Sequence, residues 1–297
     1  PISHGDRESD SPITTAEVTD SILQGLLEDL SKDRLALPTP RGIAQHIINI
    51  VTRPVVDRDV IAEAIVLDPA LTAQVLRIAN SAFYERAGEV LSINEAVALM
   101  GSQTVGNVVS LLSISQINEA RLDASFQEQL RASWRTARQV SHLSSIVASG
   151  AGVDAHLARV VGLVHNLGTL AMGVWAEQIP HLANNATRVA RVAKRLRHAA
   201  TIRIFEQWQV SEQLVCALDE FASLRSPPQR APVLSDCVAA AWLLVQHPDT
   251  SAFLASDAMR AGPIEKLGLD EAIVFDLMAE RAALDSVLDA QLGTHID

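Results

Sequence analysis

Apolar residues recur along this chain every three or four positions, the spacing that places them on one face of an α-helix. Residues 70–80, ALTAQVLRIAN, show the pattern clearly. The apolar residues on one face of this segment are Leu71, Val75, Ile78 and Ala79. We find no internal repeat and no convincing alternation of apolar and polar residues, which would mark a half-buried β-strand. The pattern therefore predicts an all-α protein.

Capping residues and prolines mark where the predicted helices begin and end. Asp68 followed by Pro69 is a typical start, with Asp as the cap and Pro in the first turn. Residues 14–17 (TTAE) and 92–95 (SINE) have the spacing of capping boxes. The proline-rich segment 223–232 is expected to be a loop. The expected helices cover residues 14–30, 43–53, 57–66, 69–80, 92–100, 101–117, 126–149, 154–174 (a pair), 184–208, 211–224, 234–246 and 270–292.

Composition and charge favour a helical, soluble protein that does not bind nucleic acid or membrane over a broad surface. Ala, Leu and Val dominate, and aromatic residues make up only 4%, which favours helices over strands. Hydrophobic residues account for 48% of the chain and charged residues for 20%, as in ordinary folded, soluble proteins. The net charge of −11 argues against broad contact with nucleic acid or with an anionic membrane.

No segment predicts export or insertion into a membrane. The first ten residues, PISHGDRESD, lack the apolar centre of a signal peptide. The longest apolar stretch, residues 160–176, is interrupted by His165 and Asn166 and is too short for a membrane span. We therefore expect a cytoplasmic protein with free thiols. Cys216 and Cys237 both lie in apolar helical segments, so both are expected in the core rather than in a zinc site.

Four segments of the chain resemble the HDOD family, a bacterial group related to the HD phosphohydrolases. They are LALPTP (35–40), DPALTAQVLRIANSAFY (68–84), LSINEAVALMGSQTVGNVV (91–109) and ARVVGLVHNLGTLAM (158–172). The last is similar to the Ala-Gly-Leu-Leu-His-Asp-Ile-Gly helix of the family. The resemblance implies an HD-related helical domain over residues 30–230, after an N-terminal tail and first helix at 1–29. Residues 231–297 would then form a helical C-terminal extension.

The resemblance also indicates where a metal site would lie. HD phosphohydrolases bind metal through an adjacent His and Asp, with further His and Asp ligands from neighbouring helices. The carboxylate supplies the negative charge that offsets a hard divalent cation. Here Asn166 stands in its place, and an amide carries no such charge. The other matching positions also differ, because Thr136 replaces a His, and Asp219 and Glu220 replace a His pair.

We therefore interpret the matching positions as a degenerate site without catalytic residues, metal or cofactor. Its members are Thr136, His165, Asn166, His198, Asp219 and Glu220. His198 is the only further position that could offer a ligand beside His165. We expect His165 to be a buried histidine whose ring nitrogens are satisfied by neighbours, with Asn166 in the same network.

One basic segment contrasts with the acidic chain. Residues 188–203, RVARVAKRLRHAATIR, contain no acidic residue. The basic side chains that could form one patch are Arg188, Arg191, Lys194 and Arg195. One interpretation is a solvated helix face that pairs with acids elsewhere on the protein. The other is a docking site for an acidic partner or a phosphate-bearing ligand, which arginine forks bind well.

The sequence thus predicts a non-catalytic module of bacterial signal transduction that acts through protein–protein contacts. Two alternatives stay open. One is a metal-dependent phosphohydrolase that uses His165 with unusual ligands, and the other is a sensor that binds a nucleotide. Nucleic acid is not expected as a partner, because no aromatic residue is interleaved within the basic segment and the total charge opposes it. The oligomeric state is not specified by any motif.

Overall fold

The computed structural model describes residues 15–32, 46–50, 53, 56–81, 89–109, 124–177, 179, 186–208, 211–223 and 230–293. These residues form helices and no β-strand, so the predicted all-α class is confirmed. The elements are α1 (Thr15–Ser31), α3 (Arg58–Ile65), α4 (Pro69–Ala79), α5 (Ile93–Met100), α7 (Ala124–Ala151), α8 (Ala155–Val164), α9 (Leu167–Glu177), α11 (Ala186–Gln207), α12 (Glu212–Ser223), α13 (Leu234–Val245), α14 (Thr250–Leu254), the 3₁₀ helix η2 (Asp257–Arg260), α15 (Gly262–Lys266) and α16 (Glu271–Gly293). Residues 46–50 and 102–109 are helical as well.

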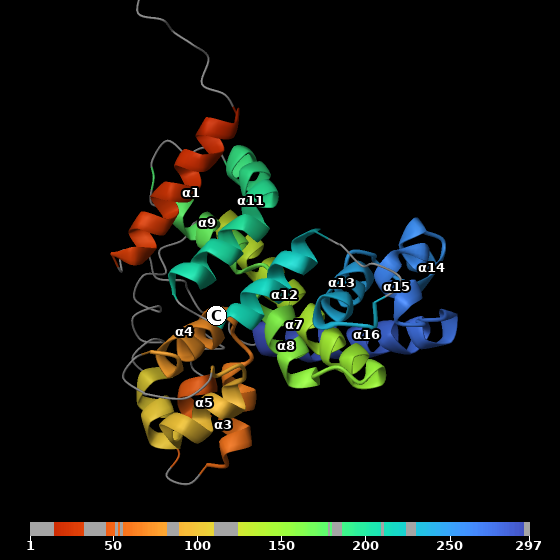
Figure 1. Cartoon of the computed structure of the whole chain (residues 1–297), viewed down its shortest axis with the longest axis horizontal. Helices are drawn as coiled ribbons and strands as arrows, with labels where there is room; N and C mark the ends of the chain where they lie inside the picture. The colour runs from red at the N-terminus through yellow and green to blue at the C-terminus, as the bar shows by residue number, and fades with distance from the viewer. Residues whose placement is uncertain are drawn as a thin grey trace, which may run out of the picture.

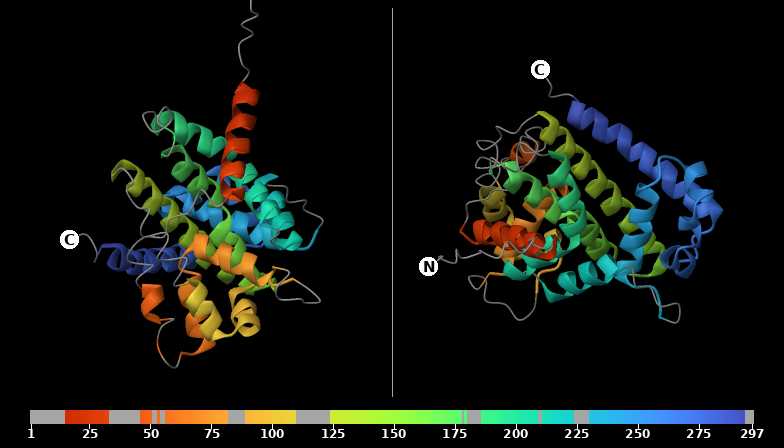
Figure 2. Two further views of the ribbon diagram at one scale, coloured as in Figure 1. Left: turned by 90° about the vertical axis from the view of Figure 1, so that its left-hand side faces the viewer. Right: turned by 90° about the horizontal axis from the view of Figure 1, so that it is seen from above.

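The helices are grouped around α7 and α8 (Figure 1). α3, α4 and α5 lie together at one end of the molecule, and α1, α9 and α11 lie together at another. α13 packs on α7, and the long helix α16 runs along the outer side of α7, as Figure 2 shows from above. One hydrophobic core connects these groups, from Leu26 in α1 to Met278 in α16. The C-terminal extension therefore shares its core with the rest of the chain.

The capping residues found in the sequence begin helices in the structure. The Asp68 side chain accepts the amide of Leu71 at 2.6 Å and starts α4. Ser92 accepts the amide of Glu95 at 3.2 Å and starts α5. Glu95 reaches back to the amide of Leu91 rather than to that of Ser92, so this capping box is shifted by one residue. The capping box expected at 14–17 begins outside the described residues.

Three short helices between α13 and α16 were not predicted. α14, η2 and α15 have four or five residues each, which is too few for a hydrophobic period to show. Asp249 accepts the amide of Ala252 at 2.8 Å and begins α14. A buried ion pair of 2.8 Å between Lys266 and Asp236 attaches α15 to the start of α13. These contacts hold the segment against the core despite its lack of regular pattern.

The apolar stretch from Ala155 to Ala176 lies in the centre of the protein. It is long and apolar enough to cross a membrane, but 89% of its apolar window is buried inside the structure. The stretch is broken into α8 and α9, and the break falls at His165 and Asn166. This burial on all sides explains its composition, because a core helix needs no polar face.

Two glycines allow the helices around this break to approach closely. A Cβ atom on Gly168 would lie 2.4 Å from the carbonyl oxygen of Arg197 and 2.6 Å from the amide of Thr201. A Cβ atom on Gly162 would lie 2.9 Å from Cα of Ser141. Because these neighbours are backbone atoms, glycine is required where α9 meets α11 and where α8 meets α7.

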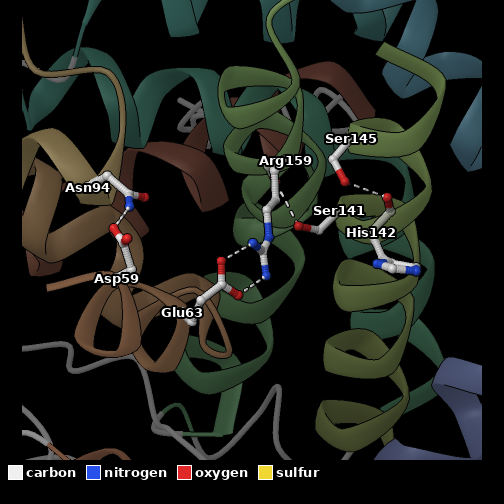
Figure 3. A network of polar contacts seen from close by, with 7 residues as sticks. All are labelled: Asp59, Glu63, Asn94, Ser141, His142, Ser145 and Arg159. Carbon is white, nitrogen blue, oxygen red and sulfur yellow. Dashed lines mark hydrogen bonds and ion pairs between the residues drawn. The ribbon is translucent and has the colours of Figure 1, made fainter. Parts of the chain in front are cut away.

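The α3–α5 group meets the rest of the chain along a boundary that we call the seam. Its polar contacts join Glu63 with Arg159, Glu89 with Ser211, and Arg77 with Trp208. Figure 3 shows Glu63 of α3 bound through both carboxylate oxygens to Arg159 of α8, at 2.5 and 2.6 Å. The Ser141 hydroxyl donates to the carbonyl of Arg159 at 2.8 Å, which ties the same residue to α7. The seam therefore holds two helix groups together by charges near the surface.

The two cysteines differ, and one prediction was wrong. Cys237 is buried as expected, and burial raises the pKa of its thiol to about 12. Cys216 is exposed, although we expected it in the core. The buried face of α12 consists of Leu214, Ala217, Leu218 and Phe221. Position 216 lies two residues after Leu214, which turns it to the opposite side of the helix.

Candidate functional site

His165 closes the end of α8 and is almost fully buried, with 2% of its surface exposed. Its Nδ1 lies 2.6 Å from the carbonyl oxygen of Gly162, one of the last carbonyls of that helix. A carbonyl oxygen only accepts, so Nδ1 carries the hydrogen and Nε2 keeps its lone pair. Burial lowers the pKa of His165 to about 4; the hydrogen bond to Gly162 opposes this shift, and the nearby His198 and Arg197 add to it. The ring is therefore neutral at pH 7.

Asn166 directs its hydrogen bonds to a different helix from those of His165. Its Nδ2 donates to the carbonyl and to the hydroxyl of Ser133 on α7, at 3.1 and 3.0 Å. The Ser133 carbonyl fixes the orientation of the amide, since only the NH₂ end can donate to it. Oδ1 is left buried, with no hydrogen-bond partner among the described residues. The expected shared network is thus replaced by separate anchors for the two side chains.

His198 and Arg197 are consecutive residues of α11 and are bonded to each other. Nε of Arg197 donates to Nε2 of His198 at 2.9 Å, so the lone pair of that nitrogen is occupied. The guanidinium also lies over the ring of Trp242 of α13, 5.4 Å from its centroid. Burial, and next the charge of Arg197, lower the pKa of His198 to about 4. His198 is therefore also neutral at pH 7.

Phe221 joins these side chains into one group. Its ring is fully buried and meets His165 edge to face at 5.7 Å and His198 at 5.2 Å between centroids. It meets Trp242 in the same way at 6.3 Å. We call the group of His165, Arg197, His198, Phe221 and Trp242 the histidine cluster. An apolar ring thus contacts both imidazoles that the sequence indicated as remaining ligands.

Thr201 links α9 to α11 next to the histidine cluster. Its hydroxyl accepts the amide of Gly168 at 2.9 Å and donates to the carbonyl of Arg197 at 2.7 Å. The bond crosses from α9 to α11 at the point where glycine permits close approach. Arg197 and His165 are therefore positioned by the same helix contact.

The remaining predicted site residues, Thr136, Asp219 and Glu220, are not part of the histidine cluster. Thr136 is half-buried on α7, and the amide of Asn166 bonds instead to Ser133, one turn earlier. Asp219 is exposed. Glu220 accepts from Arg230 at 3.1 Å and from the Ser235 hydroxyl at 2.9 Å, so its oxygens are used at the start of α13. Among the described residues, no three His, Cys, Asp or Glu side chains gather closely enough to hold a metal ion.

The basic segment lies on α11, as expected. Arg195 is exposed. The side chains of Arg188, Arg191 and Lys194 lie outside the described part of the structure. Arg203 pairs with Glu206 of the same helix at 3.1 Å. For this residue, the contact agrees with the first interpretation, a solvated helix face whose basic side chains pair with acidic ones.

Sequence reasoning missed Ser133, Phe221 and Trp242. No motif marks them, because a hydroxyl, a phenyl and an indole are common in any helical core. Arg197 was counted only as part of a basic segment. Its position next to His198 was the available signal, since a cation beside a histidine disfavours a second cation there.

The comparisons with known proteins agree with this architecture. The model of the HDOD domain matches residues 37–221 of the chain. The MmoQ response regulator from Methylococcus capsulatus str. Bath superposes with a TM-score of 0.65 and 22% identity, over 82% of this chain and 98% of that one. A virulence factor from Campylobacter jejuni has a TM-score of 0.63 and 15% identity, over 89% of this chain and 96% of its own. No curated protein matches the sequence significantly.

Proposed function

The chain belongs to the HDOD family, and we propose that it is a non-catalytic signalling module that acts through contact with a protein partner. One observation carries the non-catalytic part of this proposal: Nε of Arg197 occupies the lone pair of His198. The signalling part is supported by the family and by a response regulator of the same fold. The histidine cluster then serves as the packed centre of a binding scaffold.

A divalent metal at His198 would be opposed by the charge of Arg197. The metal would have to replace the guanidinium at Nε2 and would then lie next to it. At about 4 Å and an effective dielectric constant of about 20, two unit charges repel by about 4 kcal/mol, and a divalent ion doubles this cost. Neither Asn166 nor Phe221 supplies the negative charge that would compensate for it.

The amide of Asn166 does not act as a substitute for the missing carboxylate. Its NH₂ group is committed to Ser133, and its oxygen carries no net charge. A neutral amide oxygen supplies none of the negative charge that a carboxylate contributes to hold a hard divalent cation. We therefore expect Asn166→Asp alone to leave the protein without tight binding of divalent metal, because Arg197 and Phe221 remain in place.

The proposal is tested by metal content and hydrolysis together. The full chain, purified without chelators, is analysed for iron, manganese, zinc and magnesium, and is assayed with a phosphodiester substrate. His165→Ala is compared with His156→Ala, a change at an exposed histidine of α8. We expect substoichiometric metal and no turnover in all three proteins. Stoichiometric metal together with turnover that only His165→Ala abolishes would show that the chain is an enzyme.

A further inference from the structure

Arg197 is a half-buried cation without a carboxylate partner among the described residues. Burial lowers the pKa of its guanidinium, and no acidic side chain acts in the opposite direction. Arg138 differs in this respect, because Asp68 raises its pKa against the effect of burial. Removing a charge from water is costly unless an opposite charge or hydrogen bonds compensate for it. Among the described residues, the contacts of Arg197 are an imidazole and an indole ring, so an anionic group is the partner that its charge lacks.

The contacts of Arg197 hold its guanidinium in one orientation. Nε is bonded to His198, and the plane lies over Trp242. The two Nη groups have no hydrogen-bond partner among the described residues. They form the end of the guanidinium fork, which matches two oxygens of a carboxylate or phosphate. Because the side chain is already ordered, little conformational entropy is lost when such a group binds.

Among the described residues, a second polar group without a hydrogen-bond partner lies just before α9, the helix that packs on α11. Oδ1 of Asn166 is buried without a donor among the described residues, and Asn166 is more than nine-tenths buried. It precedes Gly168 by two residues, and Gly168 packs directly on the backbone of Arg197.

The two acidic side chains that precede Phe221 in α12 do not compete for Arg197. Glu220 is occupied by Arg230 and Ser235, and Asp219 is exposed. His165 and His198 are neutral at pH 7, so they neither repel nor neutralise an anion. We propose that Arg197 anchors a binding site for a small molecule bearing a phosphate or carboxylate group, held end-on by its two Nη groups. The site goes beyond the signalling role and needs no metal.

Binding of defined anions to the full chain tests this site. Inorganic phosphate, AMP and acetate are titrated at constant ionic strength in EDTA, which removes any contribution from metal-borne phosphate, and binding is followed by calorimetry and NMR. Arg197→Gln is compared with Arg203→Gln, which removes the same charge from an exposed position of the same helix. We expect Arg203→Gln to bind as the wild type does, and Arg197→Gln to lose about tenfold or more in affinity.

The three probes also separate the possible sources of the anion. Tighter binding of phosphate or AMP than of acetate identifies a phosphorylated ligand, and the reverse order identifies a carboxylate. If Arg197→Gln does not fold, Arg197→Lys keeps the charge without the fork and is expected to weaken binding as well. The proposal is wrong if the wild type binds none of the probes up to about 10 mM. It is equally wrong if Arg203→Gln and Arg197→Gln lose affinity alike, because general charge would then explain the binding.

Discussion

The histidine cluster and the seam differ in how their charged groups are placed: the cluster is buried, whereas the ion pair of the seam lies near the surface. In the cluster, both histidines are neutral and the one cation is stacked on Trp242. At the seam, Glu63 and Arg159 form an ion pair, and 59% and 31% of their side chains remain exposed. Water screens the pair at the seam, whereas the buried cluster gains stability only when charge is absent or compensated. The comparison indicates that the cluster contributes most to stability, and that the seam mainly sets how two helix groups meet.

Removing Phe221 should break the cluster most severely. Phe221→Ala takes away the ring that contacts both histidines and leaves a cavity in the core. We expect the free energy of unfolding to fall by about 3–5 kcal/mol in urea denaturation. Phe275→Ala, the same change at a side chain that is 61% exposed, should cost less than about 1 kcal/mol. Similar losses in the two variants would contradict a packed role for Phe221.

Acidification should destabilise the protein through His165. Its pKa is about 4 in the folded protein and about 6.5 in the unfolded chain, so the unfolded chain takes up the proton first. The contribution of His165 to stability is complete above about pH 6.5 and is lost as the pH falls toward 4, by about 3 kcal/mol in total. Urea titrations between these values measure the slope. His165→Gln should reduce the slope and leave the part that comes from His198, whereas His156→Gln should not change it; an unchanged slope in His165→Gln would refute this assignment.

A methyl group at Gly168 should separate α9 from α11. The backbone of Arg197 and Thr201 leaves no space for a Cβ atom, so Gly168→Ala should destabilise by about 1–3 kcal/mol or more. Gly150→Ala is the matched control, because position 150 lies in a helix with nothing within 4 Å of the new atom. We expect that control to gain about 0.5–1 kcal/mol. Thermal unfolding of both variants would show whether close packing is required here.

Of these changes, breaking the ion pair of the seam should have the smallest effect on the free energy of unfolding. A double-mutant cycle of Glu63→Gln and Arg159→Gln should give a coupling of about 0–1 kcal/mol that decreases with added salt. The packing of the two histidines against Phe221 should have no such dependence on salt, since both rings are neutral. A coupling above about 2 kcal/mol that salt does not change would show that the Glu63–Arg159 pair behaves as a buried ion pair. The difference in stability between the seam and the histidine cluster would then be refuted.

Local signals were sufficient to predict most helices. Asp68 and Ser92 cap the helices that their side chains indicated, because a cap depends on residues only two or three positions away. The short helices after α13 lacked a period, and Cys216 was assigned to the wrong face of α12. In both cases a few residues could not define which side faces the core.

The site required information that is not local. His165 was recognised from its motif, but its neighbours come from helices far apart in the chain. Phe221 directly follows Asp219 and Glu220. The rotation of α12 about its axis brings the phenyl ring, and not the two carboxylates, to the histidines. Ser133 rather than Thr136 bonds to Asn166 because the packing of α7 on α8 and α9 sets which turn faces the break.

The most direct test of the central claim is the state of the two imidazoles in the presence of metal. Histidine ¹⁵N labelling and NMR at pH 7 report which ring nitrogen carries the hydrogen and whether a metal binds. We predict neutral rings with the hydrogen on Nδ1 for both His165 and His198, unchanged by excess zinc or manganese. Stoichiometric metal that alters the Nε2 signals of both histidines would show that the site is a functional metal centre, and would contradict this account.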